Sequence, residues 1–254
     1  MSKYLIRGRK LFSCHVWFEG VSTDIDCGDY IVYHGLTGNS PVKGEYKRNL
    51  QNSLVTDLTS DDEKIFSEFS STVRNEINRS IKENVRYEMY LSDKILSDDT
   101  VLKNFSLMYK EMYKEKGLNR KLDTNELSAY AEKGDLMISA VFIDEKPVIY
   151  HSYIYSEKNA RLLHSCSEFR NEDKAMKNSI GRANKYLHWK DMKSLKSIGI
   201  ENYDWGGVSS FSEPNGIDKF KISFGGKPCT YYNVLCLRTF RAKVLFAIKK
   251  FLRK

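Results

Sequence analysis

The sequence contains few cysteines, and their arrangement argues against two kinds of site. Its 254 residues include five cysteines, an odd number, and no pair has the Cys-x-x-Cys spacing of a redox or zinc motif. No cysteine and histidine have the spacing of zinc ligands either, so we expect no bound metal. A chain of this length buries a substantial core without cross-links, and we therefore expect reduced thiols rather than a disulfide framework. The five positions are Cys14, Cys27, Cys166, Cys229 and Cys236.

Long apolar runs are also missing. No stretch approaches the ~20 consecutive apolar residues that a membrane-spanning helix needs. The first ten residues are basic but contain no apolar segment of the kind found in signal peptides. These absences predict a cytoplasmic protein that is soluble or, at most, peripheral on the inner face of the membrane.

Acidic residues are absent from the last part of the chain. No Asp or Glu follows Asp218, whereas residues 219–254 contain ten Lys and Arg residues. The formal net charge of the whole chain is +8, so residues 1–218 carry −2. The basic character is therefore local, and it gives weak support for nucleic-acid binding by the protein as a whole.

The same C-terminal segment is amphipathic. In residues 238–254, apolar side chains recur at helical spacing between basic ones. A basic amphipathic helix of this kind suits an anionic membrane surface, and the tail could also serve binding of tRNA. A terminal helix that docks on its own domain is the alternative. The apolar positions are Phe240, Val244, Leu245, Ile248, Phe251 and Leu252.

Apolar periodicity and turn residues predict an α+β fold. The expected sheet is mixed and mostly antiparallel, because three successive strands are joined by short polar turns. A helix at 60–84 is expected to begin at Ser60, and a loop rich in Gly, Asn and Ser is expected at 37–53. The other expected strands are 11–18, 30–34, 85–91, 136–143, 148–155, 161–167, 200–205 and 230–237. The other expected helices are 98–116, 124–132, 179–198 and 218–223, followed by the C-terminal helix.

The helix at 179–198 carries polar residues on the face that should pack inward. At about 100° per residue, Asn184, His188 and Asp191 share a side with apolar residues such as Leu187. Burying such groups without partners costs roughly 1–3 kcal/mol each. They therefore either hydrogen-bond to the backbone of neighbouring strands or line a substrate cleft, where His188 would exchange protons near neutral pH. Both interpretations stay open.

Two basic residues and a tryptophan fall on the opposite face of this helix. Arg182 and Lys185 could bind the phosphates of a nucleotide- or lipid-linked sugar, or could simply be solvated. Trp189 lies beside them. Gly181, near the expected start of the helix, also suggests a phosphate held by free backbone N–H groups.

Glycine pairs stand beside aromatic and charged residues in two later segments. The first is Tyr203-Asp204-Trp205-Gly206-Gly207, and the second contains Gly216-Ile217, Phe220-Lys221 and Phe224-Gly225-Gly226. Two successive glycines after a strand allow the backbone to approach a ligand or another strand without a Cβ in the way. This composition is unusual for a plain core element.

Together with residues 179–189, these segments resemble the Fem-type branch of the GNAT acyltransferase superfamily. The resemblance is strongest over about residues 130–235 and weaker over 55–130. It implies a GNAT-like domain at 56–237, with residues 1–55 as the remnant of a second GNAT-like half and 238–254 as a basic helix. The chain departs from the family in two ways. It is too short for two full domains and a helical arm, and its loop at 168–181 lacks the usual pyrophosphate-binding pattern of acetyl-CoA enzymes.

The resemblance implies transfer of an acyl group to an amine. The expected acceptor is an amino sugar or a related lipid- or nucleotide-linked precursor of a bacterial surface polysaccharide, with acyl-CoA as co-substrate and no bound cofactor. An aminoacyl-tRNA-dependent transferase of the peptidoglycan-bridge type is the alternative. A non-catalytic binding protein on the same scaffold is a third interpretation, because a fold does not fix a function.

Amide formation needs a deprotonated amine, a positioned carbonyl group and stabilisation of the tetrahedral oxyanion. The resemblance implies that Lys221 stabilises the oxyanion electrostatically. Asp204 and His188 are the candidate bases, although Asp204 could instead bond to the Gly206-Gly207 turn. The residues expected to bind substrate are Asn184, Arg182, Lys185, Trp189, Trp205, Gly206, Gly207, Phe220 and Phe224.

Overall fold

A computed structural model of the chain describes residues 2–18, 27–83, 85–169 and 172–252. The chain forms two compact units: residues 1–53 with 229–254, and residues 54–228. Two long strands, β4 (Glu45–Asp57) and β10 (Lys227–Leu237), run through the boundaries between the units. The expected domain of residues 56–237 thus differs from the larger unit mainly at its C-terminal end, where residues 229–237 join the smaller one.

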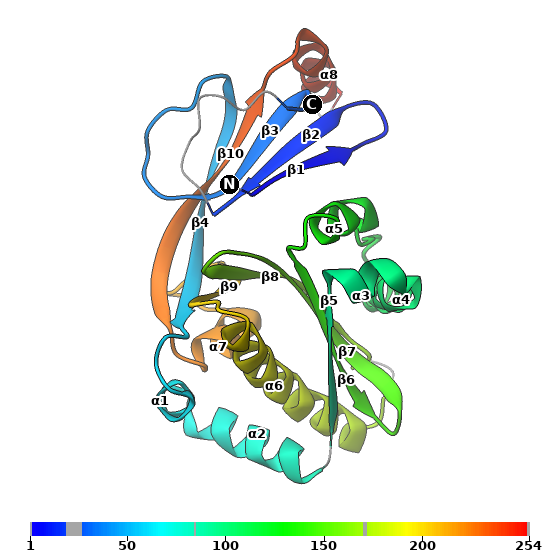
Figure 1. Ribbon diagram of the computed structural model, residues 1–254, viewed down its shortest axis with the longest axis vertical. Helices are drawn as coiled ribbons and strands as arrows, with labels where there is room; N and C mark the ends of the chain where they lie inside the picture. The colour runs from blue at the N-terminus through cyan, green and yellow to red at the C-terminus, as the bar shows by residue number, and fades with distance from the viewer. Residues whose placement is uncertain (1, 19–26, 84, 170–171, 253–254) are drawn as a thin grey trace. The chain divides into compact units, whose positions relative to one another are not determined.

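The smaller unit contains one end of the sheet and helix α8 among its described residues. Its strands follow the order β1 (Ser2–Arg7), β2 (Phe12–Trp17), β3 (Tyr30–Leu36), β10 and β4. The pairs β1–β2 and β3–β10 are antiparallel, and β2–β3 is parallel. Helix α8 (Phe240–Phe251) follows β10 (Figure 1). The predicted C-terminal helix is therefore present, and its last two residues, 253 and 254, lie outside the described residues.

The expectation that all cysteines are reduced is wrong for two of them. Cys14 on β2 and Cys27, just before β3, form a disulfide with Cα atoms 5.9 Å apart. The parallel pairing of β2 with β3 brings the two cysteines within bridging distance. A separation of 13 residues without a motif gave no sign of this in the sequence. Cys166 and Cys236 are free thiols.

The larger unit is an antiparallel sheet with one parallel strand at its side. The strand order is β5, β6, β7, β8 and β9, in which only β8–β9 is parallel. Helices α2 and α6 cover one face, whereas α3, α4 and α5 cover the other (Figure 1). The strands are β5 (Arg86–Leu91), β6 (Leu136–Ile143), β7 (Lys146–Ser156), β8 (Asn159–Ser167) and β9 (Asn202–Val208). The helices are α1 (Asp62–Ser67), α2 (Ser71–Lys82), α3 (Ser92–Ser97), α4 (Asp99–Glu115), α5 (Thr124–Ala131), α6 (Lys174–Ser197) and α7 (Gly216–Ile222).

This is the α+β architecture expected from the sequence, with a mixed and mostly antiparallel sheet flanked by helices. Among the described residues, no helix has both the length and the apolar character needed to cross a membrane. The main core lies between the sheet and α6, where Tyr153, Tyr203, Trp205 and Phe224 are fully buried.

Three sequence predictions need correction. The second half of the loop expected at 37–53 is strand β4, whose first residues are polar and exposed, so they lack the apolar alternation by which strands are recognised. The helix expected at 60–84 is two helices, because the Ser70 side chain caps α2 by accepting from the Val73 N–H. Asp61, rather than Ser60, caps α1.

Candidate active site

The candidate site lies where two parallel strands part. β8 and β9 are joined by α6 and pair in parallel over three residue pairs, Asn159–Asn202, Ala160–Tyr203 and Arg161–Asp204. Beyond Asp204 the ladder ends, although both strands continue. Ligands in α/β proteins bind at the carboxyl ends of neighbouring parallel strands, where backbone groups are not used by the sheet. The parting of β8 and β9 is such a position.

Gly206 makes the close approach of the two strands possible. Its φ is +73°, a conformation that residues with a side chain rarely adopt, and an added Cβ would lie 2.9 Å from the Leu162 carbonyl oxygen. The backbone of β9 therefore passes β8 at a distance that admits no side chain. The prediction that a glycine here allows another strand to approach is confirmed.

We expect Gly206→Ala to destabilise the protein by about 2–4 kcal/mol, from left-handed strain and overpacking against a backbone carbonyl. Gly181→Ala is the matched control, since no atom lies within 4 Å of a Cβ at that helical glycine. It should stabilise the protein by about 0.5–1 kcal/mol. Urea unfolding of both variants measures the difference, and equal midpoints would contradict this account of Gly206.

Asp204 holds the turn that contains this glycine. Its carboxylate accepts from the Gly206 N–H at 2.8 Å and lies 3.4 Å from the Arg161 guanidinium. Both side chains are buried. The alternative role for Asp204, bonding to the Gly206-Gly207 turn, is thus present in the structure.

Helix α7 brings Lys221 to the same place. The Lys221 Nζ donates to the Gly207 carbonyl oxygen at 2.7 Å and would lie 3.9 Å from a Cβ on Gly206. The buried Asp218 fixes the helix, because it accepts from the N–H and Oγ of Ser209 and from the Asn215 N–H. Asn215 and Asp218 form a capping box at the start of α7.

Burial lowers the pKa of Lys221 from its usual value near 10.5. The negative charges of Asp204 and Asp218 oppose this effect, and the positive charge of Arg161 adds to it. The ammonium is therefore partly desolvated and close to two carboxylates. In such surroundings a positive charge interacts more strongly with a developing anion than it would in water.

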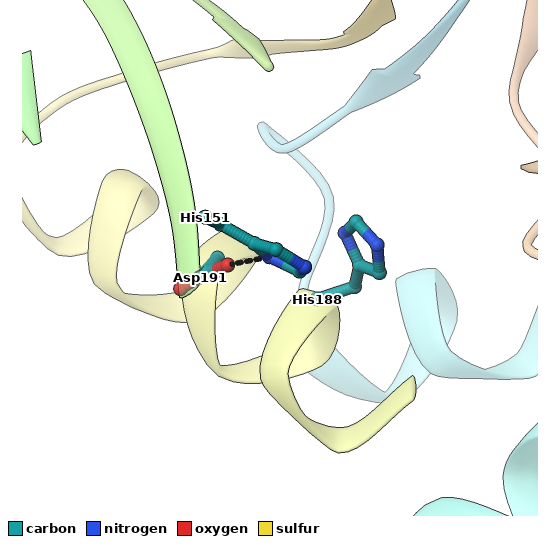
Figure 2. Close-up of side chains that lie close together, drawn as sticks. All are labelled: His151, His188 and Asp191. Atoms are coloured by element: carbon teal, nitrogen blue, oxygen red, sulfur yellow. Dashed lines mark hydrogen bonds and ion pairs between the residues drawn. The ribbon is translucent and has the colours of Figure 1, made fainter. Parts of the chain in front are cut away.

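A buried hydrogen-bonded network lies behind this site, on α6, β7 and β9. Figure 2 shows His151 of β7 bonded to Asp191 of α6, with the His188 ring beside it. The distance between His151 Nδ1 and Asp191 Oδ2 is 2.8 Å, and His151 Nε2 is 3.0 Å from the Asn184 amide oxygen. The network continues from Asp191 through Tyr153 and Tyr203 to His188, with contacts of 2.7, 2.8 and 2.8 Å.

The order of donors fixes the tautomer of His188. Tyr153 has one hydroxyl proton and donates it to Asp191, so Tyr203 must donate to Tyr153. The Tyr203 oxygen can then only accept from His188, whose Nδ1 carries the proton while Nε2 keeps a lone pair. Burial lowers the pKa of His188 well below its ordinary value. Burial thus favours the neutral imidazole, and the expectation that His188 exchanges protons near neutral pH stays a prediction.

His151, His188 and Asp191 each present a ligand atom within 4.8 Å of the others, as a metal site would require. Hydrogen bonds account for much of this arrangement, although the buried Oδ1 of Asp191 has no hydrogen-bond partner among the described residues. Both ring nitrogens of His151 have partners, and the 2.8 Å contact with Asp191 is a direct hydrogen bond. The polar stripe is hydrogen-bonded, but its partners are side chains, whereas backbone groups of neighbouring strands were expected.

No protein-family model and no curated protein matches this chain in sequence. The similarity is to solved structures. A C-terminal domain of a putative lysylphosphatidylglycerol synthetase from Agrobacterium fabrum aligns with 96% of this chain and 87% of its own, at 13% identity and a TM-score of 0.55. FemX aligns over 78% of this chain with the same TM-score and 15% identity.

The chain shares its fold with FemX and with the synthetase domain. The match spans 63% of FemX, so a further part of FemX has no counterpart in the alignment. A conserved protein of unknown function from Bacteroides thetaiotaomicron has a TM-score of 0.50 at 14% identity. The fold expected from the glycine-rich and helical segments is therefore confirmed.

Two residues expected to bind substrate lie elsewhere in this fold. Arg182 is buried and forms a bidentate pair with Glu83, with contacts of 2.7 and 3.2 Å. Trp189 is buried against Phe66 and Phe69. Helix α2 covers the face of α6 that appeared exposed in the sequence, and this contact explains both corrections.

The phosphate site expected at Gly181 is wrong for a different reason. Helix α6 begins at Lys174, so Gly181 lies in its interior, where backbone N–H groups are used by the helix. The helix start is capped by Asp173, which accepts from the Met176 N–H at 2.8 Å. Lys185 pairs with Glu76 at 2.7 Å and also lies over the Phe220 ring.

The aromatic residues of the Fem-type segments divide into core and site. Trp205 is fully buried and donates from Nε1 to the Thr56 hydroxyl, and Phe224 is equally buried. Phe220 is half-buried and adjacent to His188, with ring centroids 5.5 Å apart. Gly207 is exposed. Of the expected binding residues, Gly206, Gly207 and Phe220 lie with Lys221 around the parted strands.

Several residues that support the site are not predicted from the sequence. Arg161 and Asp218 hold Asp204 and α7, and His151, Tyr153 and Tyr203 complete the buried network. Asp218 could have been recognised, because Asn215 and Asp218 have the three-residue spacing of a capping box. The others give no local signal, since their partners lie 38 to 50 residues away or on another strand.

Proposed function

We propose that the chain is an acyltransferase whose reaction takes place where β8 and β9 part. The observation that carries the proposal is the half-buried ammonium of Lys221 beside Gly206 and the exposed Gly207. One N–H of Lys221 is directed to the Gly207 carbonyl, which leaves two N–H groups for a ligand. Such a group stabilises the oxyanion that forms when an amine attacks an ester or thioester.

In this reaction the acceptor nitrogen forms a bond to the carbonyl carbon, and the bond from that carbon to sulfur or oxygen breaks. The amine also loses a proton, and the departing thiolate or alkoxide takes one up, so the products are an amide and a thiol or alcohol. We assign removal of the amine proton to His188, whose neutral imidazole keeps a lone pair on Nε2. The side chain is buried beside Phe220, so the assignment requires that the acceptor reach it past this ring. Asp204 is the less suitable base, since Gly206 and Arg161 already engage its carboxylate.

For the acceptor, we propose an amino sugar or a related lipid- or nucleotide-linked precursor of a surface polysaccharide, with acyl-CoA as donor. The support for this acceptor is the resemblance of the 179–226 segments to Fem-type proteins that act in the cell envelope. A further part of the proposal is peripheral attachment to a membrane through residues 238–254.

A specific observation favours aminoacyl-tRNA as an alternative donor. In this chain the start of α6 is capped by the Asp173 carboxylate, and Glu168 and Glu172 lie beside it, both paired with Lys146. A diphosphate such as that of CoA would meet negative charge here rather than free backbone N–H groups. The similar synthetase domain is named for a lysyl-lipid product, which is consistent with an aminoacyl donor.

A thermal-shift screen of CoA thioesters, charged tRNA and nucleotide sugars tests the proposal. A ligand at 100 times its dissociation constant stabilises the folded state by about 2.7 kcal/mol, and the melting temperature rises accordingly. Donors and acceptors that raise it are then combined, and the amide product is sought by mass spectrometry. We expect one donor class and one amine acceptor to give product.

The control is Lys219→Met, which removes an exposed lysine two residues before Lys221. Product formation should survive this change. If ligands bind but no donor and acceptor pair gives product, the chain is a binding protein on a Fem-type scaffold instead.

A further inference from the structure

Helix α8 is held on the smaller unit by one of its faces. Ala242 is fully buried, and the Phe246 ring packs edge-on against Tyr30 and Tyr46 at 5.4 and 5.5 Å. Thr239 caps the helix by accepting from the Ala242 N–H and also donates to Asp29. The orientation of α8 on this unit is therefore set by packing and by its cap.

The opposite face of α8 is apolar and uncovered. Phe240 and Phe251 are 82% and 80% exposed, and Ile248 is 50% exposed. At about 100° per residue, Phe240, Val244, Ile248 and Phe251 fall within a sector of roughly 80°, on the far side of the helix from Ala242 and Phe246. A helix whose only role is to dock would carry polar residues here. The docking alternative thus accounts for one face of α8 and leaves the other unexplained.

Basic residues surround this apolar face. Arg241, Lys243 and Lys250 are exposed on α8, and no acidic residue occurs after Asp218. The turn between β1 and β2 adds Arg9 and Lys10, which are also exposed. This turn and α8 enclose a hollow of about 460 Å³, lined by Gly8–Leu11, Tyr30, Leu245, Phe246, Ile248, Lys249 and Leu252.

We propose that α8 and the β1–β2 turn form a surface that binds an anionic lipid bilayer. The apolar sector of α8 enters the boundary between headgroups and acyl chains, and the basic residues contact anionic headgroups. A helix of 12 residues is about 18 Å long. It is too short to span the ~30 Å hydrocarbon core and instead lies in the interface.

Charge complementarity favours a lipid surface over a second copy of the chain. Two copies meeting through α8 would bring Arg241, Lys243 and Lys250 together with no carboxylate on either helix. Like charges in contact oppose such a dimer. An anionic bilayer offers the opposite charge over the whole surface, together with an apolar layer for the phenylalanines.

Co-sedimentation of the full chain with vesicles tests the proposal without any assay of transfer. We compare vesicles of phosphatidylcholine alone with vesicles that also contain roughly 30% phosphatidylglycerol, an anionic lipid. We expect binding to the anionic vesicles that weakens as salt is raised. Binding to both kinds of vesicle alike at low salt would overturn the proposal.

Two pairs of variants separate the apolar and the electrostatic contributions. Phe240→Ser with Phe251→Ser should weaken binding about tenfold or more, since both rings leave the interface. The matched control is Ile81→Ser on α2, an exposed apolar residue of the other unit. Lys243→Gln with Lys250→Gln should also weaken binding roughly tenfold or more, whereas Lys103→Gln with Lys114→Gln on α4 should not.

All of these side chains are exposed, so the variants should fold, and circular dichroism checks this. Unchanged binding in the double phenylalanine variant would contradict the proposal. It would also fail if the protein were a dimer in solution that the same variant dissociates, because α8 would then be covered by a second copy. The result does not depend on whether Lys221 supports transfer.

Discussion

Replacing Lys221 by Met should lower acyl transfer about 100- to 1,000-fold, the loss that follows removal of one oxyanion donor. The methionine keeps the apolar part of the side chain but removes the ammonium. Stability should change little, because the lost hydrogen bond to Gly207 is offset by the removal of a partly desolvated charge. Initial rates with the donor and acceptor found in the screen, together with melting temperatures, measure both effects.

Lys219→Met is the matched control, since it removes an exposed lysine from the same helix and should leave the rate unchanged. A rate for Lys221→Met within a factor of three of wild type would exclude the electrostatic role of Lys221. So would an equal loss in both variants.

The pH dependence of the rate gives a second test of Lys221. The ammonium is the active form, so the rate should fall as pH rises through the pKa of Lys221. Burial lowers that pKa, and the fall should therefore occur below the value near 10.5 of an ordinary lysine. In Lys221→Arg the guanidinium stays charged at such pH values, so the decrease in rate should move to higher pH. An unchanged alkaline limb in the arginine variant would show that another group causes it.

Much of the fold could be predicted from the sequence, because most strands have a recognisable pattern of apolar residues and turns. The three strands of the meander, β6 to β8, have apolar residues and short polar turns, and their predicted positions agree with the structure to within two residues. β4 was missed because its polar side chains face solvent while backbone bonds hold it in place. The Cys14–Cys27 disulfide depends on the pairing of β2 with β3, which no residue pattern reveals.

Site residues could be predicted from the sequence where the backbone conformation restricts the residue type. They could rarely be predicted where their contacts are with distant parts of the chain. Gly206 could be inferred because only glycine fits a left-handed turn beside another strand. The exposure of α6 could not be inferred, since periodicity separates two faces without showing that α2 covers one of them. Periodicity therefore places Arg182 and Trp189 at the substrate, whereas they pack against α2 and the α1–α2 segment.

The other large expected effect is on stability. Asp191→Ala should destabilise the protein by about 3–5 kcal/mol, the cost of removing one partner from a buried, charged hydrogen-bond network. Asp191 is fully buried, and its Oδ2 accepts from Tyr153 and lies 2.8 Å from His151 Nδ1. Both groups would be left in the core without this partner. Urea unfolding of the variant and of wild type measures the change.

Asp99→Ala is the matched control, because Asp99 is 72% exposed and pairs only at the surface with Lys103. Its effect should stay below about 1 kcal/mol. Tyr153→Phe tests one link of the network, since it removes the connection between Tyr203 and Asp191 but leaves His151 paired with Asp191. It should cost about 1–3 kcal/mol, less than Asp191→Ala. If the Asp191 and Asp99 variants unfolded at the same urea concentration, the network would not support α6, and the tautomer assigned to His188 would lose its basis.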